Sequence, residues 1–225
     1  PVAGAVPAAA QSGTPQALTG LRVIELASPL THYCGKMFAE LGAEVILVEP
    51  PGGSATRSAF PHSGDISGST GGASHSLSFS YLNTSKRSIT LDWRKPEGAR
   101  LLRELVAGSD LFLEAEKPGR LVAAGCGWET LSAAHPTLVM TSVTGFGQTG
   151  PYASRAGYDF LIQGMGGLMS ITGVKDGEPG AGPQKVGVAL TDIMTGLYST
   201  VGILAALAHR ERTGRGQYLD MALLD

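Results

Sequence analysis

Two apolar runs joined by a helical pattern constrain the fold of this chain more than any other feature of its sequence. The runs span residues 21–27 and 43–49, and the second is β-branched and unbroken. Such runs are typical of strands that are covered on both faces in a parallel sheet. Between them, apolar residues recur at helical spacing as far as Leu41. The segment therefore predicts a β-α-β unit.

The same alternation of strands and helices continues along the chain. Further strands are expected at residues 88–91, 111–115, 138–146, 185–190 and 217–224. Helices are expected from Lys95 to Val106, at 128–134 and 158–171, and from Thr191 to about Arg212. We expect an α/β fold, with a Rossmann-like open parallel sheet and flanking helices. Residues 51–76 predict a long mobile loop, whose Gly- and Ser-rich part, 62–76, has no assigned role.

The charge balance argues against two classes of partner. With 17 Lys and Arg residues against 19 Asp and Glu, the net charge is -2, so there is no basic excess for a phosphate backbone or an anionic membrane. We therefore expect no nucleic-acid and no membrane partner. The longest uncharged apolar segment, 193–208, is shorter than the ~20 residues that span a bilayer and predicts a buried helix.

Cysteine usage and missing motifs exclude several chemistries. Cys34 and Cys126 lie far apart, with no histidine or cysteine at metal-ligand spacing near either. The sequence therefore predicts no metal site, no disulfide framework and a reducing, cytoplasmic location. The junction after the first run, residues 27–36, lacks the G-x-G-x-x-G of nicotinamide-binding folds. A phosphate-binding loop and a G-x-S-x-G elbow are also missing from the sequence.

Asp192 has the most informative position of any carboxylate in the sequence. It stands where an apolar run meets a long uncharged helix, so its charge is expected near a helix N-terminus, where the macrodipole favours anions. Local sequence alone leaves two interpretations open. One is a helix N-cap, and the other is a functional carboxylate.

Six sequence blocks, in order, resemble those of the class III CoA-transferases of the formyl-CoA transferase type. They are LTGLRVIEL, LGAEVILVEPPGG, LNTSKRSITLD, TGFGQTGPY, RAGYDFLIQGMGGLMSITG and KVGVALTDIMTGLYSTVGILAALAHRERTGRGQ. The resemblance implies that residues 18–225 form the large CoA-binding domain and that the family's smaller second domain is absent from this chain. The active protein is then expected to be an interlocked homodimer or a split, heteromeric assembly. Residues 1–17 carry no charged side chain and are expected to form a disordered leader.

The resemblance also implies an activity, the transfer of CoA from an acyl-CoA donor to a carboxylic acid acceptor. The family's catalytic aspartate falls on Asp192, within ALTDIMTG. Its carboxylate is expected to attack the thioester, giving an acyl-aspartyl anhydride and then an aspartyl-CoA thioester, which the incoming acid resolves. CoA thioesters are substrates in this scheme, and no permanently bound cofactor is expected.

A set of polar residues that follow the expected strands is implied to bind CoA. These residues are Arg57, Asn83, Thr84, Ser85, Lys86, Lys117, Thr144, Gly145 and Phe146. Lys86 is the first choice for a phosphate contact, and a solvated lysine before an edge strand is its structural alternative. Gly145 would let a ligand approach the backbone closely. A loop charge at Arg57 and an ordinary turn at 144–146 are the corresponding alternatives there.

The chain departs from the family pattern at two blocks, so we expect a remodelled CoA pocket. Residues 31–35 replace an Ala-Gly-Pro turn, and residues 114–119 replace Glu-Asn-Phe-x-Pro-Gly. A related activity, that of α-methylacyl-CoA racemase, needs a histidine where this chain has Tyr158, and tyrosine ordinarily stays protonated at neutral pH. The alternatives to a transferase are thus an acyl-CoA racemase or epimerase and a non-catalytic CoA-binding subunit.

Overall fold

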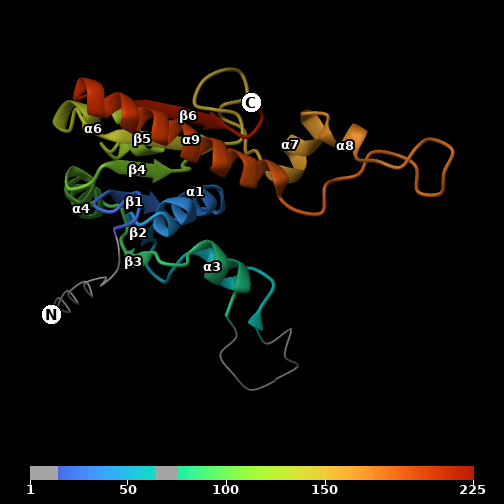
Figure 1. Ribbon diagram of the computed structural model, residues 1–225, viewed down its shortest axis with the longest axis horizontal. Helices are drawn as coiled ribbons and strands as arrows, with labels where there is room; N and C mark the ends of the chain where they lie inside the picture. Colours follow the sequence, from blue (N-terminus) through green and yellow to red (C-terminus); the bar gives the residue numbers. More distant parts are fainter. Residues whose placement is uncertain (1–14, 64–74) are drawn as a thin grey trace.

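Six parallel strands form one sheet in the computed structural model, which describes residues 15–63 and 75–225 (Figure 1). The strand order, β3-β2-β1-β4-β5-β6, is that of dinucleotide-binding Rossmann folds. The expected Rossmann-like α/β class is therefore confirmed. The strands are β1 (Arg22–Leu26), β2 (Glu44–Glu49), β3 (Arg87–Thr90), β4 (Leu111–Glu114), β5 (Val139–Thr144) and β6 (Tyr218–Ala222).

Helices cover both faces of the sheet, which explains why its central strands are apolar without alternation. Helices α1 and α9 pack on the face that carries Val23, whereas α4 and α6 pack on the face that carries Ile24. Adjacent residues of β1 thus enter opposite cores. The helical elements are α1 (Pro29–Glu40), η1 (Ala55–Ser58), α3 (Leu77–Leu82), α4 (Pro96–Ala107), α5 (Arg120–Ala123), α6 (Trp128–Ala134), α7 (Asp159–Met165), α8 (Leu168–Ile171) and α9 (Leu190–Thr213).

The order of the strands creates a switch point at β1. From β1 the chain first adds β2 and β3 on one side and then returns to add β4, β5 and β6 on the other. In open parallel sheets such a reversal leaves a crevice beyond the carboxyl ends of the two central strands. Figure 1 shows α7 and α8 beyond the arrowheads of β4 and β6, at this same end of the sheet.

Helix α9 is long and apolar enough, by length and composition, to be a candidate membrane span. Its best window has a mean hydropathy of 1.4, and 39% of that window is buried within the fold. The helix packs against α1 and β5, with Ile203 in the core and Val201 61% exposed. Contacts within the domain therefore account for the buried part of its apolar surface.

Two sequence-based predictions of secondary structure are wrong. Residues 185–190 contain no strand, because β6 occupies the edge beside β5 and the N–H of Val186 donates to Gln163 Oε1 at 2.9 Å. Residues 158–171 form two short helices rather than one, because the chain turns at Gly167 with a φ of 80°. Ile171 is 81% exposed, so this segment is also less packed than expected. The short helices α3 and α5 are not predicted by the sequence pattern.

The expected leader and the expected loop fall partly outside the described residues, which exclude 1–14 and 64–74. Within the described part, Gln16 belongs to a turn before β1, where its N–H donates to Thr19 Oγ1 at 2.8 Å. Residues 55–58 form the 3-10 turn η1 inside the expected loop. The described part of each segment therefore contains local structure.

Candidate active site

Two pockets meet beyond the carboxyl ends of β1 and β4, where the strand order places the crevice. One has a volume of about 520 Å³ and contains Asp192. The other has a volume of about 290 Å³ and contains Arg94. Both pockets are lined by Ser28, Pro29 and Ala115. We call the two pockets together the switch-point groove.

Asp159 holds the start of helix α9 and thereby places Asp192 in this groove. Asp159 Oδ1 accepts hydrogen bonds from the backbone N–H and the hydroxyl of Thr191, both at 2.8 Å. Its Oδ2 accepts from Gln163 at 2.8 Å. Ala189, the residue before α9, offers no side-chain cap, so Asp159 supplies one from another part of the chain. Asp192, the third residue of the helix, is therefore not its N-cap.

The Asp192 carboxylate is not fully hydrogen-bonded within residues 15–63 and 75–225. Its Oδ1 is buried and has no hydrogen-bond partner among the described residues. Burial, together with the negative charge of Asp159, raises the pKa of Asp192 to about 6. The carboxylate is consequently ionised at neutral pH but poorly solvated, which suits a nucleophilic aspartate.

Lys86 lies in a buried ion pair and not in the switch-point groove. Its Nζ is 2.8 Å from Glu25 Oε2, and the Lys86 side chain is 1% exposed. The ammonium also donates to the His32 carbonyl at 2.9 Å and to Asn83 Oδ1 at 3.0 Å. The ammonium therefore has two hydrogen-bond acceptors and one ion-pair partner inside the protein, and its burial keeps it from facing a CoA phosphate. The alternative of a solvated lysine is wrong.

The preceding residues of this segment close the turn between α3 and β3. Asn83 Nδ2 donates to the Phe79 carbonyl at 3.0 Å, and Thr84 Oγ1 donates to the Ser80 carbonyl at 3.0 Å. Ser85 has a φ of 64°, in the left-handed region that a turn of this kind requires. None of the three lines either pocket of the groove.

Arg94 lines the groove, whereas Arg57 and Lys117 do not. Arg94 lines it directly and was missed by the sequence reasoning, although its position just after β3 was a usable signal. Arg57 makes two hydrogen bonds of 2.6 Å to Glu49 and is half-exposed. It directly follows Thr56, which lines the groove. Lys117 is exposed and lines a separate pocket of about 260 Å³ with Glu114.

The residues at the end of β5 and just after it support the groove without lining it. Thr144 is buried, and its hydroxyl has no partner among the described residues. A Cβ on Gly145 would lie 2.3 Å from the Cα of Gly157, so the missing side chain makes room for the backbone of Gly157. Phe146 packs edge-on against Tyr152, with ring centroids 5.5 Å apart. Gly157 itself lines the Asp192 pocket, so this contact fixes part of the groove wall.

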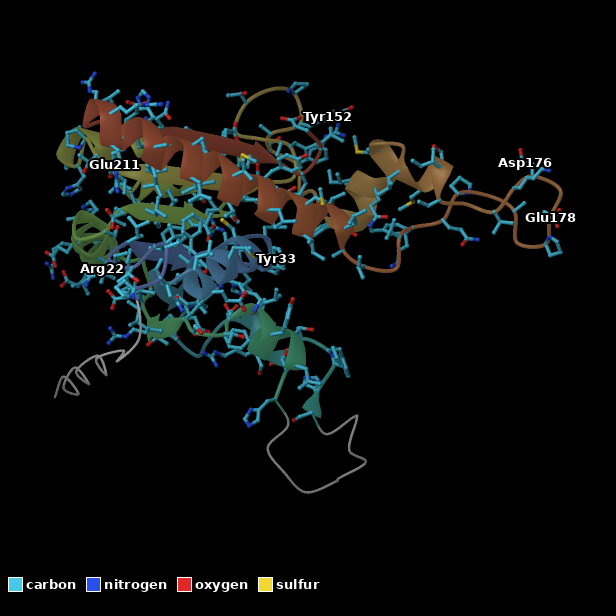
Figure 2. The ribbon with its side chains drawn as sticks, in the orientation of Figure 1. Arg22, Tyr33, Tyr152, Asp176, Glu178 and Glu211 are labelled. Atoms are coloured by element: carbon cyan, nitrogen blue, oxygen red, sulfur yellow. The ribbon has the colours of Figure 1, made fainter. Side chains whose placement is uncertain are left out.

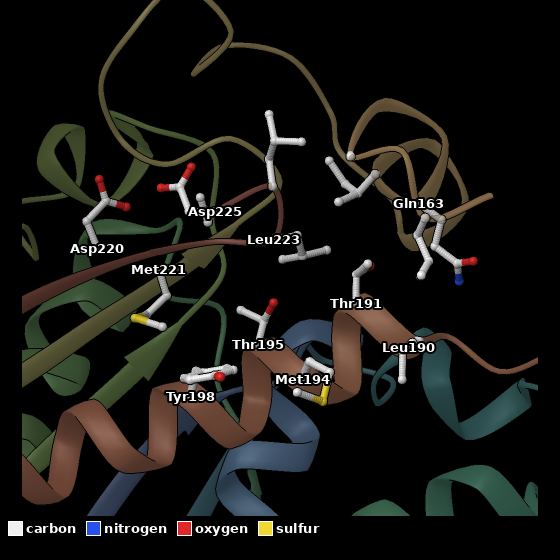
Figure 3. A pocket seen from close by; sticks show the side chains of 15 residues that line it. Gln163, Leu190, Thr191, Met194, Thr195, Tyr198, Asp220, Met221, Leu223 and Asp225 are labelled. Carbon is white, nitrogen blue, oxygen red and sulfur yellow. The ribbon is translucent and has the colours of Figure 1, made fainter. Parts of the chain in front are cut away.

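A fourth pocket, of about 540 Å³, lies between α9 and the end of β6 (Figure 3). Met194 and Tyr198 line it from α9, and Leu223 lines it from the segment after β6. Asp192 is not among its lining residues. This pocket is therefore separate from the switch-point groove.

Comparison with known proteins decides the family. The model of CoA-transferase family III matches residues 18–225. The chain belongs to this family. Succinate--glutarate CoA-transferase of Agrobacterium fabrum is 48% identical over 211 residues, which are 92% of this chain and 51% of that protein. Succinyl-CoA--L-malate CoA-transferase beta subunit of Chloroflexus aurantiacus is 41% identical over 210 residues, 92% of this chain and 49% of that protein.

A solved structure extends the family comparison to the fold. The crystal structure of a CaiB/BaiF family protein from Brucella suis matches with a TM-score of 0.84 and 48% identity, covering 94% of this chain and 54% of that one. The resemblance expected from the motifs is thus confirmed. The family III chain spans about half the length of the relatives it matches.

Replacing Lys86 with methionine is expected to lower the free energy of unfolding by about 3 kcal/mol, because Glu25 then becomes an unpaired buried charge. Chemical denaturation at neutral pH measures the change. The double variant Glu25→Gln/Lys86→Met should recover much of the loss. Lys95→Met, at a side chain that is 76% exposed, should cost less than about 0.5 kcal/mol. An equally small cost for Lys86→Met would contradict the ion-pair role.

Asp192→Asn is expected to stabilise the fold at neutral pH and not in acid. The unfolded carboxyl ionises near its ordinary pKa of 3.8, whereas the folded one ionises at about 6. Ionisation therefore costs folding free energy increasingly from about pH 4 to pH 6, and asparagine removes that cost. The expected gain above pH 6 is about 1 kcal/mol, after allowance for solvent screening.

Denaturation curves at about pH 4 and about pH 8 test this pH dependence. Asp176→Asn is the matched control, on an exposed loop that extends away from the sheet (Figure 2). An equal effect of Asp192→Asn at both pH values would show that the carboxylate carries no such cost.

Proposed function

We propose that this chain supplies the nucleophile and the CoA-binding groove of an acyl-CoA:carboxylic acid CoA-transferase, with Asp192 as the nucleophile. One observation carries the proposal. Asp192 Oδ1, a buried oxygen without a hydrogen-bond partner among residues 15–63 and 75–225, lies in one pocket of the switch-point groove, and the cation Arg94 lines the other. This arrangement supports a thioester beside Asp192 and CoA phosphates beside Arg94.

The proposed reaction proceeds by exchange of acyl bonds at Asp192. The carboxylate attacks the thioester carbonyl, and the C–S bond breaks. CoA leaves as a thiolate, and an acyl-aspartyl anhydride remains. The thiolate attacks the aspartyl carbonyl and displaces the donor acid, leaving an aspartyl-CoA thioester. The acceptor carboxylate then attacks this thioester and releases the thiolate again. Attack of that thiolate on the acceptor's acyl carbon gives the new acyl-CoA and restores the carboxylate, without net proton transfer.

The environment of Asp192 favours these steps. Its position in the first turn of α9 places the reacting carbonyl near the positive end of the helix dipole. This positive end stabilises the oxyanion that develops during each attack. The neighbouring charge of Asp159 disfavours the ionised carboxylate, and acylation of Asp192 relieves that repulsion.

We propose that the acceptor is a dicarboxylate. The two relatives described above are named for succinate with glutarate and for succinyl-CoA with malate. To bind the acceptor's second carboxylate, the pocket needs a cation close to the place where the acceptor's first carboxylate reacts. Among the residues that line the Asp192 pocket, Lys185 supplies the cationic side chain. This side chain is exposed and donates a hydrogen bond to the Val186 carbonyl at 3.2 Å.

Because the relatives are about twice as long, we propose that a second domain or chain completes the site in an interlocked homodimer or a split assembly. Both cysteines are free and buried, which suits a reducing compartment such as the cytoplasm. Within residues 15–63 and 75–225, no group of three or more His, Cys, Asp or Glu side chains could hold a metal ion. The proposed chemistry requires neither a metal nor a permanent cofactor, and we propose no nucleic-acid or membrane partner.

Asp192→Ala is expected to lower CoA transfer by about a thousandfold while changing the Kd for CoA less than about threefold, because the nucleophile lies apart from the phosphate end of the groove. In the complete assembled enzyme, hydroxylamine added after the acyl-CoA donor should convert Asp192 to a hydroxamate, detected by peptide mass spectrometry. Asp176→Asn should leave both the turnover and the trapping unchanged.

Other outcomes of this experiment identify the alternatives. Unaltered turnover in Asp192→Ala would remove the aspartate from the mechanism. Exchange of deuterium at the α-carbon of the acyl-CoA without CoA transfer would favour the racemase, for which Tyr158 lies in the same pocket as Asp192. Tight CoA binding with no turnover in the wild type would favour a non-catalytic subunit.

Lys185→Met is expected to raise the KM for glutarate about tenfold and to leave the KM for butyrate within about twofold, because only the dicarboxylate has a charge to pair with the lysine. Steady-state transfer assays with the two acceptors measure the difference. Lys185→Arg should retain most of the preference. An equal rise in both KM values would assign Lys185 a role in the pocket other than recognition of the second carboxylate.

A further inference from the structure

A buried histidine connects the central ion pair to the wall of the switch-point groove. His32 is 0% exposed, and its Nδ1 is 2.8 Å from Glu25 Oε1. Its Nε2 is 3.1 Å from the hydroxyl oxygen of Thr56. The ring of Phe79 meets the imidazole edge-on, with centroids 6.1 Å apart. Nothing in the proposed chemistry uses His32, yet both of its nitrogens are engaged.

Thr56 is the point at which this connection reaches the groove. Ser54, Ala55 and Thr56 all line the pocket that contains Arg94. The hydroxyls of Ser54 and Thr56 are 2.8 Å apart, and the N–H of Thr56 donates to Ser54 Oγ at 3.3 Å. Residues 54–56 therefore form a hydrogen-bonded part of the groove wall, and His32 contacts this part from inside the protein.

The partners of His32 fix the direction of these hydrogen bonds. Lys86 and His32 hold the pKa of Glu25 below its ordinary value in spite of burial, so its carboxylate only accepts. His32 therefore donates from Nδ1 to Glu25. Because the Lys86 ammonium already balances the Glu25 charge, we assign His32 the uncharged form, in which Nε2 is an acceptor. Thr56 consequently donates its hydroxyl hydrogen to His32. The Ser54 hydroxyl donates to Thr56, whose oxygen keeps one lone pair unused.

We propose that His32 is a positioning residue for CoA, because it holds the Thr56 oxygen as a hydrogen-bond acceptor for an amide N–H of the pantetheine arm. The proposal rests on the proposed function of the groove. An oxygen whose hydrogen is committed to His32 suits an N–H donor and would repel a phosphate. Thr56 also lies in the pocket that adjoins the Asp192 pocket, along the path from the phosphates to the thioester.

Paired variants separate the two contacts of His32. His32→Asn keeps an N–H near the position of Nδ1 for Glu25 and removes the contact to Thr56. Thr56→Val removes the hydroxyl at nearly constant shape, whereas Thr56→Ser retains it and serves as the control. Thr56 borders a pocket, so Thr56→Val keeps the proposal testable if His32→Asn fails to fold.

Isothermal titration of the complete enzyme with CoA and with 3′-phospho-ADP, which lacks the pantetheine arm, tests the proposal. Thr56→Val and His32→Asn should each raise the Kd for CoA about five- to tenfold and leave the Kd for 3′-phospho-ADP within about twofold. Because both act through one contact, the double variant should bind CoA no more weakly than either single variant. In transfer assays, the KM for the donor should rise while kcat stays within about twofold.

Each contrary result has a distinct meaning. If the wild type binds CoA and both variants bind it equally well, the positioning role is overturned. If the variants weaken the binding of CoA and of 3′-phospho-ADP to the same extent, His32 supports the structure of the groove as a whole, and the proposal is overturned. The proposal is also overturned if the double variant binds CoA more weakly than either single variant. If the wild type binds neither compound, the proposed function of the groove fails.

Discussion

A carboxylate buried in the central strand determines much of the structure around it. Glu25 lies on β1 with 0% exposure. Burial alone would raise its pKa, but the charge of Lys86 and the hydrogen bond from His32 lower it instead. Gly35 belongs to the same arrangement, because a Cβ there would lie 1.9 Å from Glu25 Oε2. Helix α1 and the turn before β3 are thus both built around one charge.

The same ion pair holds a family motif outside the switch-point groove. The segment at residues 83–86 resembles a CoA-binding block, yet Lys86 is enclosed and directs its hydrogens into the protein. Its charge keeps Glu25 ionised, and the ionised Glu25 sets the proton position on His32. Lys86 is therefore connected to Thr56 in the groove wall through two buried side chains, Glu25 and His32.

The sequence predicted the elements that depend on neighbouring residues. The sequence-based predictions failed where a residue far along the chain determines the local structure. The strands at 21–27 and 43–49 were predictable because two-sided burial imposes an unbroken apolar run. Residues 185–190 have a similar composition, but β6 already fills the sheet edge beside β5. The position of Asp192 at a helix start followed from local pattern, whereas its cap, Asp159, did not. Likewise, nothing near Lys86 in the sequence indicates that Glu25 will enclose it.

Glu25 and Glu114 are both buried glutamates, but their pKa values are shifted in opposite directions. Glu114, on β4, is also buried, but it accepts hydrogen bonds from Ser142 and the N–H of Glu116, and no Lys or Arg of the described residues forms an ion pair with it. Burial therefore raises its pKa to about 7. Ionising Glu114 costs folding free energy as the pH rises above its ordinary value of 4.5, and the full cost is reached above about pH 7.

The pH dependence of Glu25 has the opposite sign. Its lowered pKa stabilises the fold above the ordinary value of 4.5, and that stabilisation is lost as the pH falls. The paired carboxylate lies beneath α1, whereas the two carboxylates with raised pKa values, Glu114 and Asp192, each line a pocket. The cation Lys86 thus lowers the pKa of a buried carboxyl, whereas Glu114 and Asp192, without a paired cation among the described residues, have raised pKa values.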